Sequence, residues 1–321
     1  MLVAFNLPSP LEKIEHDLLK NQGIRLYIKR DDIIHPTISG NKWRKLKYNI
    51  EAFQQSKKQQ LLTYGGAFSN HIYATAAAGQ LYNFNTIGII RGEKSTPLSN
   101  TLDFAGKNNM YLHFVSRTAF SDKINLRTEL ENQFGDFYEL PEGGANAYAV
   151  KGCSEIVEEV NKQLDTLPDY WCVACGTGGT LAGIIAASTQ AQNILGFSVL
   201  KSYDWDNAIS NLLNTFQDTY LQEEQYYFKR AKNWTINTDY HFGGYAKWQP
   251  ELIHSMNDFK KRYDIALDPI YTGKLFYGIF DLLKKGYFKK DSTIVALHTG
   301  GLQGIEGFNA IKLKGKGVKI L

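Results

Sequence analysis

The chain has 321 residues, and its 36 lysine and arginine residues against 32 aspartate and glutamate residues give a formal net charge of +4. This length predicts one large α/β domain or two lobes that share a core. The basic residues are spread along the sequence and form no stripe with interleaved aromatic residues, so we expect no nucleic-acid partner.

The N-terminal segment and the cysteines indicate where the protein resides. Pro8 and Pro10 follow a short apolar start, which lacks the basic region and the long apolar region of a signal peptide. No apolar run approaches the roughly 18 residues of a membrane span, so we expect no membrane partner. Three cysteines are typical of a reducing compartment. We therefore expect a cytoplasmic protein.

Short apolar runs alternate with longer helical segments along the chain, which predicts βα units and a mostly parallel sheet. The expected strands are 59–66, 84–92, 110–116, 136–144, the start of 169–188, 193–201 and 291–301. The expected helices are 70–82, 99–109, 149–164, the end of 169–188, 250–264 and 272–286.

The lobes are predicted from where these patterns change. Boundaries near residues 46 and 147 give a large lobe, formed by 1–45 plus 147–321, and a small lobe, 46–146, inserted in it. Residues 202–240 are rich in Tyr, Gln and Asn and give no clear pattern.

Cys172 and Cys175 form a C-x-x-C motif, which is typical of metal or redox sites. The motif lies in an expected strand, where an offset of three residues sends the two thiols to opposite faces. Cys153 is the one other cysteine that could complete a metal site. We therefore predict core cysteines and no metal site.

A glycine-rich loop, CGTGGT at 175–180, lies between an expected strand and an expected helix. Glycines allow the backbone to approach an anion, and Thr177 and Thr180 add hydroxyl groups. Tight packing alone also explains such glycines. The loop matches neither the P-loop nor the dinucleotide signature, so a small monophosphate fits it better.

Two more polar loops follow expected strands. GGAFSNH at 65–71 places Ser69 and Asn70 at a helix start, where an ordinary N-cap is the alternative interpretation. HTGG at 298–301 ends the last strand. Ligands bind at the carboxyl ends of strands in open α/β sheets, so these loops predict one common site.

The segment TISGNKWRKLKY at 37–48 carries Lys42, Arg44, Lys45 and Lys47. A run of cations is usually a solvated helix face. Here Gly and Asn precede Lys42, and a lysine beside a monophosphate site suggests pyridoxal phosphate as the cofactor.

The motifs SGNKWRKL, SNH, GTGGT, DPIYTGK and HTGG occur in this order and cover nearly the whole chain. This sequence resembles the 1-aminocyclopropane-1-carboxylate (ACC) deaminase/D-cysteine desulfhydrase family of pyridoxal-phosphate enzymes. The resemblance implies fold type II: α/β, with two open, mostly parallel twisted sheets flanked by helices. It also implies a small amino-acid substrate and a homodimer.

The resemblance assigns roles to individual residues. Lys42 matches the lysine that forms the Schiff base with the cofactor. Lys45 matches the residue that faces the phosphate of the cofactor. Asn70 matches the residue that hydrogen bonds the ring hydroxyl group, and Ser69 matches the residue that contacts the substrate carboxylate. The phosphate cradle implied by the same matches comprises Gly176, Thr177, Gly178, Gly179 and Thr180.

Some residues in these motifs keep two interpretations. For Arg44 and Lys47 a solvated face remains open beside the site. For His71 the alternatives are a lining residue of the pocket and a satisfied core histidine.

Tyr271 and Tyr245 match the two active-site tyrosines of the family, and either Lys42 or Tyr271 is the base that removes the α-proton. Thr272 and Thr299 stand where family ACC deaminases have Glu after the tyrosine and no Thr in the H-x-G-G segment. A hydroxyl group can hydrogen bond the ring nitrogen of the cofactor, but it does not favour protonation of that nitrogen. ACC has no α-hydrogen, so opening its ring requires the protonated nitrogen.

The threonines therefore predict elimination from D-cysteine to pyruvate, ammonia and hydrogen sulfide. The alternative enzyme activity is ACC deamination, or elimination from another small D-amino acid such as D-serine or β-chloro-D-alanine. A cofactor-binding protein without turnover is the alternative from another class.

Overall fold

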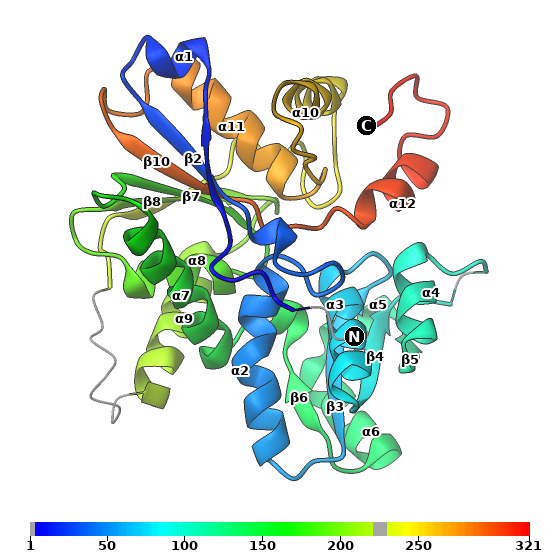
Figure 1. Ribbon diagram of the computed structural model, residues 1–321. Helices are drawn as coiled ribbons and strands as arrows, with labels where there is room; N and C mark the ends of the chain where they lie inside the picture. The colour runs from blue at the N-terminus through cyan, green and yellow to red at the C-terminus, as the bar shows by residue number, and fades with distance from the viewer. Residues whose placement is uncertain (1–3, 95, 221–229) are drawn as a thin grey trace.

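The computed structural model describes residues 4–94, 96–220 and 230–321. Its larger sheet has six strands in the order β1-β2-β10-β7-β8-β9 (Figure 1). β1 runs antiparallel to β2, and the other neighbouring strands are parallel. The strands are β1 (Leu11–Ile14), β2 (Arg25–Lys29), β10 (Thr293–Leu297), β7 (Tyr170–Cys175), β8 (Asn193–Ser198) and β9 (Trp234–Asn237).

The smaller sheet has four parallel strands in the order β5-β4-β3-β6. They are β5 (Met110–Val115), β4 (Asn85–Arg91), β3 (Gln60–Gly66) and β6 (Tyr138–Leu140). Two open, mostly parallel sheets confirm the predicted fold class.

Helices cover both faces of the large sheet (Figure 1). One face carries α1 (Asp17–Lys20), α10 (Pro250–Tyr263) and α11 (Thr272–Lys284), and the other carries α7 (Ala147–Gln163), α8 (Gly179–Ala187) and α9 (Trp205–Tyr220). The remaining helices are α2 (Asn41–Gln55), α3 (Asn70–Tyr82), α4 (Asn100–Lys107), α5 (Arg117–Ser121), α6 (Lys123–Phe134) and α12 (Gly304–Ile311).

The predicted helices are confirmed within two residues at each end wherever both ends were given. The strand expected over 136–144 is shorter, because Pro141 follows β6 and Gly143 and Gly144 take positive φ angles. The unassigned stretch 202–240 contains α9 and β9, while its residues 221–229 lie outside the described part of the chain.

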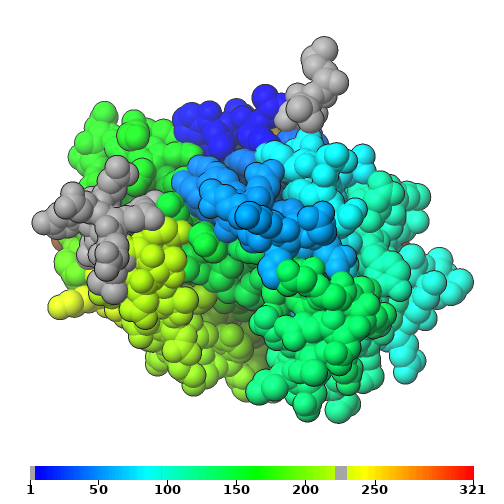
Figure 2. Space-filling model, turned by 90° about the horizontal axis from the view of Figure 1, so that it is seen from below, coloured from blue at the N-terminus to red at the C-terminus, as the bar shows by residue number. Residues whose placement is uncertain are grey.

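The two sheets divide the chain much as the expected lobes do, but the boundaries remain predictions. Helix α2 runs through the first boundary at residue 46, and α7 begins at the second. α2 packs against α7 and α3. In the space-filling view it belongs to the blue surface that lies beside the cyan and green residues of the small lobe (Figure 2).

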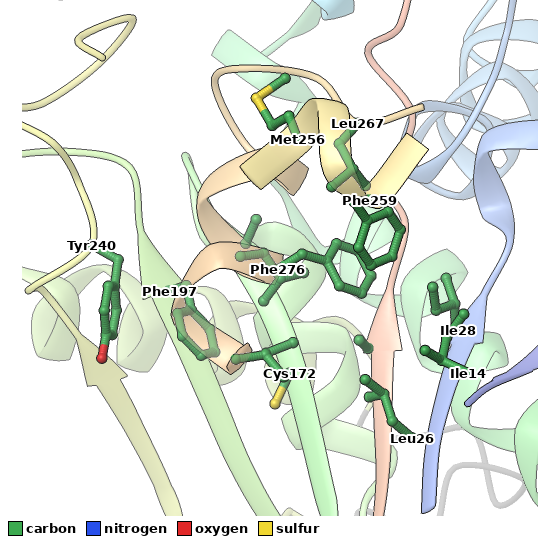
Figure 3. Close-up of a cluster of buried hydrophobic side chains, with 14 of the residues drawn as sticks. Ile14, Leu26, Ile28, Cys172, Phe197, Tyr240, Met256, Phe259, Leu267 and Phe276 are labelled. Carbon is green, nitrogen blue, oxygen red and sulfur yellow. The ribbon is translucent and has the colours of Figure 1, made fainter. Parts of the chain in front are cut away.

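The core of the large lobe separates the cysteines of the C-x-x-C motif. Cys172 packs with Phe259 and Phe276 under α10 and α11 (Figure 3). Cys175 packs in the cluster on the opposite face, with α7 and α8. The prediction of opposite faces is therefore confirmed.

The described residues, 4–94, 96–220 and 230–321, contain neither a candidate metal site nor a candidate membrane span. No group of three or more His, Cys, Asp or Glu side chains there could hold a metal ion. No helix in these ranges is both long and apolar enough to cross a membrane.

Candidate active site

A cavity of about 850 Å³ lies where the loops of both lobes meet. It is lined by the start of α2, by the loops after β3, β7 and β10, and by residues around α11. The expected site residues that line it are Lys42, Lys45, Ser69, Asn70, Gly176, Thr177, Gly178, Thr180, Tyr245, Tyr271 and Thr299. The fold thus brings together in one cavity side chains that are far apart along the chain.

The start of α2 is fixed by a close backbone contact. Gly40, the N-cap, has a φ angle of 64°, and a Cβ there would lie 1.9 Å from the carbonyl oxygen of Thr299. A side chain at this position would therefore push the two loops apart. The contact places Lys42 directly beside the HTGG loop.

Lys42 carries the amine best suited to covalent chemistry. Burial and the neighbouring Lys45 lower the pKa of Lys42 to about 7. Lys42 lines the cavity, and among the described residues none forms a hydrogen bond with its Nζ atom. A large fraction of such an amine is unprotonated near neutral pH, and only that form attacks a carbonyl carbon.

The glycine-rich loop and Lys45 form an anion cradle. Gly178, in the left-handed conformation with a φ angle of 83°, is the N-cap of α8 and offers no side chain to the first N–H groups of the helix. Nζ of Lys45 lies 3.4 Å from Oγ1 of Thr177 and 3.2 Å from the position of a Cβ on Gly179. Free N–H groups and a buried ammonium group fit the phosphate of the cofactor.

Gly179 and Thr180 take different parts in this cradle. Gly179 is the first residue of α8 and does not line the cavity, so only its backbone can take part. Thr180 lines the cavity, and its Oγ1 accepts a hydrogen bond of 2.8 Å from Nδ2 of Asn41.

Ser69 and Asn70 lie side by side in the lining of the cavity. Oγ of Ser69 accepts from the backbone N–H of Ile72, so Ser69 is the N-cap of α3 and also lines the cavity. Oδ1 of Asn70 accepts a 2.6 Å hydrogen bond from Gln303, which orients its amide group. Helix α3 therefore presents both polar side chains at its N-terminal end.

His71 is both a lining residue and a buried histidine. Thr63 donates its hydroxyl hydrogen to the carbonyl oxygen of Leu140, so it accepts from Nε2 of His71 at 2.9 Å. Nδ1 of His71 has no partner among the described residues. Burial, with the nearby lysines, lowers the pKa of His71 well below its usual value, so the ring is neutral.

Tyr271 and Tyr245 lie together at the cavity, with ring centroids 6.3 Å apart and an interplanar angle of 72°. Burial, and then Tyr245 and Asp268, raise the pKa of Tyr271 well above its usual value. Tyr271 therefore enters a reaction as a protonated phenol.

The buried ammonium group of Lys274 donates to the carbonyl oxygens of His241 and Gly244, which holds the loop before Tyr245 against α11.

Thr272 differs from its prediction. Its side chain is fully buried and does not line the cavity, because its hydroxyl group donates to Oδ1 of Asp268 at 2.8 Å. Thr299 does line the cavity. Of the two threonines, Thr299 is thus the one placed to reach a bound ligand.

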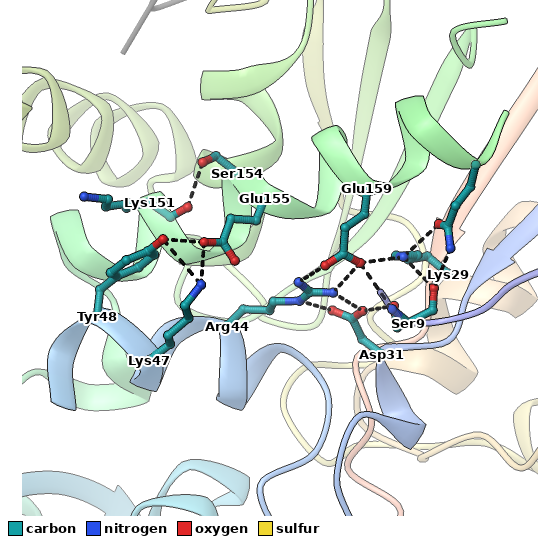
Figure 4. A network of polar contacts seen from close by, with 11 residues as sticks. Ser9, Lys29, Asp31, Arg44, Lys47, Tyr48, Lys151, Ser154, Glu155 and Glu159 are labelled. Atoms are coloured by element: carbon teal, nitrogen blue, oxygen red, sulfur yellow. Dashed lines mark hydrogen bonds and ion pairs between the residues drawn. The ribbon is translucent and has the colours of Figure 1, made fainter. Parts of the chain in front are cut away.

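Arg44 is not on a solvated face. It is 1 % exposed and lies between Asp31 and Glu159, with shortest contacts of 3.0 and 2.6 Å (Figure 4). Glu159 also pairs with Lys29 at 2.7 Å. Lys47 is half-buried and pairs with Glu155. Both side chains attach α2 to the large lobe, and neither lines the cavity.

Several residues of the site were not predicted. Asn41 and Glu142 line the cavity, and so do Arg91 and Arg117. Arg91 ends β4 and Arg117 follows β5, so the rule that ligands lie at the carboxyl ends of parallel strands could have found them. The carboxylate of Asp268 accepts a hydrogen bond from the backbone N–H of Tyr271. An aspartate just before a helix is the sequence signal of a capping residue.

This combination of a glycine-rich phosphate cradle, a reactive lysine and two mostly parallel sheets defines an enzyme of the fold type II pyridoxal-phosphate class. A family model described as "Pyridoxal-phosphate dependent enzyme" matches residues 5–300. The chain belongs to this family, and its cofactor is pyridoxal phosphate.

Individual relatives cover most of the chain. A Pyrococcus furiosus protein named "Putative 1-aminocyclopropane-1-carboxylate deaminase" is 30 % identical over 303 residues, which cover 90 % of this chain and 88 % of the relative. A mitochondrial Arabidopsis thaliana protein named as a bifunctional D-cysteine desulfhydrase/1-aminocyclopropane-1-carboxylate deaminase is 29 % identical, with coverage of 94 % and 78 %.

A solved structure agrees with these relatives. It is described as an ACC deaminase homologue and superposes with a TM-score of 0.83 at 25 % identity, covering 98 % of this chain and 95 % of that one. The sequence resemblance to this group is therefore confirmed.

Proposed function

We propose that this enzyme catalyses the elimination and deamination of D-cysteine, which with one water molecule gives pyruvate, ammonia and hydrogen sulfide. The elimination chemistry rests on the pairing of an amine with a pKa of about 7, on Lys42, with protonated Tyr271 in one cavity. The choice of D-cysteine rests on the cavity lining, which among the described residues includes Thr299 and no buried carboxylate. These two groups provide the base and the acid that a β-elimination requires.

The residues of the chain divide the work as follows. Pyridoxal phosphate supplies an electron sink for the negative charge at the α-carbon. Lys45 and the Gly176–Thr180 loop hold its phosphate. Nζ of Lys42 removes the α-proton, because the raised pKa of Tyr271 keeps this residue protonated and leaves no phenolate to accept the proton. Oη of Tyr271 then gives a proton to the departing sulfur.

The groups around the cavity favour D-cysteine over ACC. Glu142 is the one carboxylate among the described residues that line it, and it lies 3.9 Å from Lys123. The lining thus offers Thr299 but no buried carboxylate to hold a ring nitrogen protonated. D-Cysteine has an α-hydrogen, and its thiol, with a pKa of about 8.5, is a competent leaving group.

ACC deamination to 2-oxobutyrate and ammonia is the second candidate. It is supported by the names of the Pyrococcus and Arabidopsis relatives, the latter of which carries both activities in its name. The two activities share the same cofactor, lysine and tyrosines. They differ in whether the ring nitrogen of the cofactor must be protonated.

A substrate panel separates these candidates. The purified holoenzyme is given D-cysteine, L-cysteine, D-serine or ACC, and pyruvate, sulfide and 2-oxobutyrate are measured. We expect kcat/KM for ACC to be at least about 100-fold lower than for D-cysteine, a difference of about 2.7 kcal/mol. Equal values would restore ACC as a substrate. Bound cofactor without any keto acid would favour a binding protein.

We also infer a homodimer in the cytoplasm. The dimer follows from the family resemblance, and three buried free cysteines support a reducing compartment. Sedimentation equilibrium of the holoenzyme measures the first property, and a single species of about 36 kDa, the mass of one chain, would contradict it.

A further inference from the structure

Arg91 and Arg117 bring two positive charges to the wall of the catalytic cavity. The roles assigned above to Lys42, Lys45 and the tyrosines use neither arginine. Arg91 ends β4 and Arg117 begins α5, both in the small lobe, whereas Tyr245 and Tyr271 belong to the large lobe.

The backbone places the two arginines at the ends of two neighbouring strands. Arg91 pairs with Val115 in the parallel β4–β5 ladder, and Arg117 comes two residues after Val115. A Cβ on Gly66 would lie 3.7 Å from Nη2 of Arg91, so this guanidinium group extends over the end of β3, near the loop of Ser69. The charge of Arg91 also opposes the rise in the pKa of Tyr245, which lines the same cavity.

The charges near the two arginines do not neutralise them. Neither Arg91 nor Arg117 forms an ion pair with a carboxylate in the part of the chain that the structure describes; Arg91 instead lies 5.5 Å from the ring centroid of Phe120. Glu142 is the acidic neighbour, and Lys123 at 3.9 Å offsets its charge. This side of the cavity therefore keeps an excess of positive charge.

We propose that Arg91 and Arg117 form an anion subsite that binds a second acidic group on the amino-acid substrate. The inference goes beyond the proposed function, because D-cysteine has no second acidic group: it names a further class of substrate for the same cavity. Guanidinium groups bind carboxylate, sulfonate and phosphate groups through charge-assisted hydrogen bonds. The cavity volume of about 850 Å³ lies in the upper part of the usual range for ligand pockets, and this space has to hold both the cofactor and the substrate.

Calorimetric titration of the holoenzyme tests the subsite directly. The ligands are D-aspartate and D-asparagine, which match in size and differ by one charge, and the longer pair D-glutamate and D-glutamine. We expect the acidic member of at least one pair to bind about tenfold more tightly, and this preference to decrease at high salt. The L-enantiomers are titrated in the same way.

Variants assign the preference to the two arginines. Arg91→Gln and Arg117→Gln should each bring the affinities for acid and amide close together, whereas Arg91→Lys should keep part of the difference. Arg127→Gln is the matched control, because Arg127 lies on the same lobe, pairs with Glu131 and Glu139, and does not line the cavity. It should leave the preference unchanged.

The outcomes separate this inference from the proposed function. Equal affinity of the wild type for acid and amide in every pair overturns the subsite, and so does a preference that survives both Gln variants. Pyruvate release from D-cysteine is measured on the same preparation. Its absence overturns the proposed function whatever the titration shows.

Discussion

The hydroxyl group of Thr272 donates to Oδ1 of Asp268 at 2.8 Å and accepts from the backbone N–H of Asp268 at the same distance. The Asp268 carboxylate also accepts the backbone N–H groups of Ile270, Tyr271 and Thr272. One buried carboxylate thus fixes the start of α11, from which Tyr271 extends into the cavity.

We expect Thr272→Val to lower the free energy of unfolding by about 1–3 kcal/mol, because the buried Asp268 carboxylate loses one of its donors. Urea unfolding of the holoenzyme, followed by fluorescence, measures the change. Thr299→Val is the control at the cavity wall and should affect activity more than stability. An unchanged unfolding midpoint for Thr272→Val would show that this hydrogen bond contributes little.

Lys42 should be the residue that links covalently to the cofactor. Borohydride reduction of the yellow holoenzyme followed by peptide mapping should locate the label on Lys42. Lys42→Ala should lose turnover, whereas Lys47→Ala, at a residue paired with Glu155 outside the cavity, should keep it. A label on any other lysine would disprove the assignment.

Covalent attachment at Lys42 should depend on pH with a midpoint near 7. The unprotonated amine is the reactive form, so a pKa of about 7 predicts that the rate rises through pH 7 and levels off above it. An ordinary lysine, with a pKa of about 10.4, would give a rate that continues to rise. Stopped-flow mixing of the apoprotein with pyridoxal measures this rate.

Lys45 provides a second check on the same pKa. Its positive charge helps to lower the pKa of Lys42, so Lys45→Gln should move the midpoint to higher pH. Pyridoxal has no phosphate, which separates this effect from the part that Lys45 takes in the phosphate cradle. An unchanged midpoint would mean that burial alone sets the pKa.

Much of the fold and of the site could be predicted from the sequence because the signals are local. Apolar runs that end in glycines gave the parallel strands and the loops at their carboxyl ends. Ser69, Asn70 and the Gly176–Thr180 loop follow directly from such strands. Because these residues follow the carboxyl ends of parallel strands, they lie where the cavity forms.

The remaining features depend on packing that no local pattern describes. Arg44 and Lys45 are neighbours on one helix turn, yet one pairs with Asp31 and the other faces the phosphate cradle. The sequence does not show which partner each side of α2 meets. Thr272 was expected in the cavity because the motif placed it beside Tyr271, but Asp268 binds its hydroxyl group from the opposite side.

Tyr271→Phe should lower kcat by about 10²–10⁴, because it removes the hydroxyl group that we propose as the general acid. The free energy of unfolding should change little, since only one oxygen is lost. Tyr277→Phe, on the same helix but outside the cavity, is the control and should keep wild-type kcat. A loss below threefold for Tyr271→Phe would make this residue a packing contact.

Arg44→Met should be among the most destabilising single changes in the lobe that carries Lys42. The substitution keeps an apolar stem but leaves the carboxylates of Asp31 and Glu159 without their shared partner. Removing one member of a buried ionic network typically costs about 3–5 kcal/mol. Lys29, which still pairs with Glu159, should keep the loss near the lower end of this range.

The matched control for Arg44→Met is Lys47→Met, three residues along the same helix. Lys47 and Glu155 are half-buried, and Glu155 also accepts a hydrogen bond from Tyr48, so it keeps a partner when Lys47 is replaced and the change should cost less than about 1 kcal/mol. Because α2 carries Lys42 at its start, Arg44→Met should also slow covalent attachment of pyridoxal, while Lys47→Met should not. Chemical unfolding and stopped-flow attachment measure the two effects, and equal values for both variants would show that the buried network does not position Lys42.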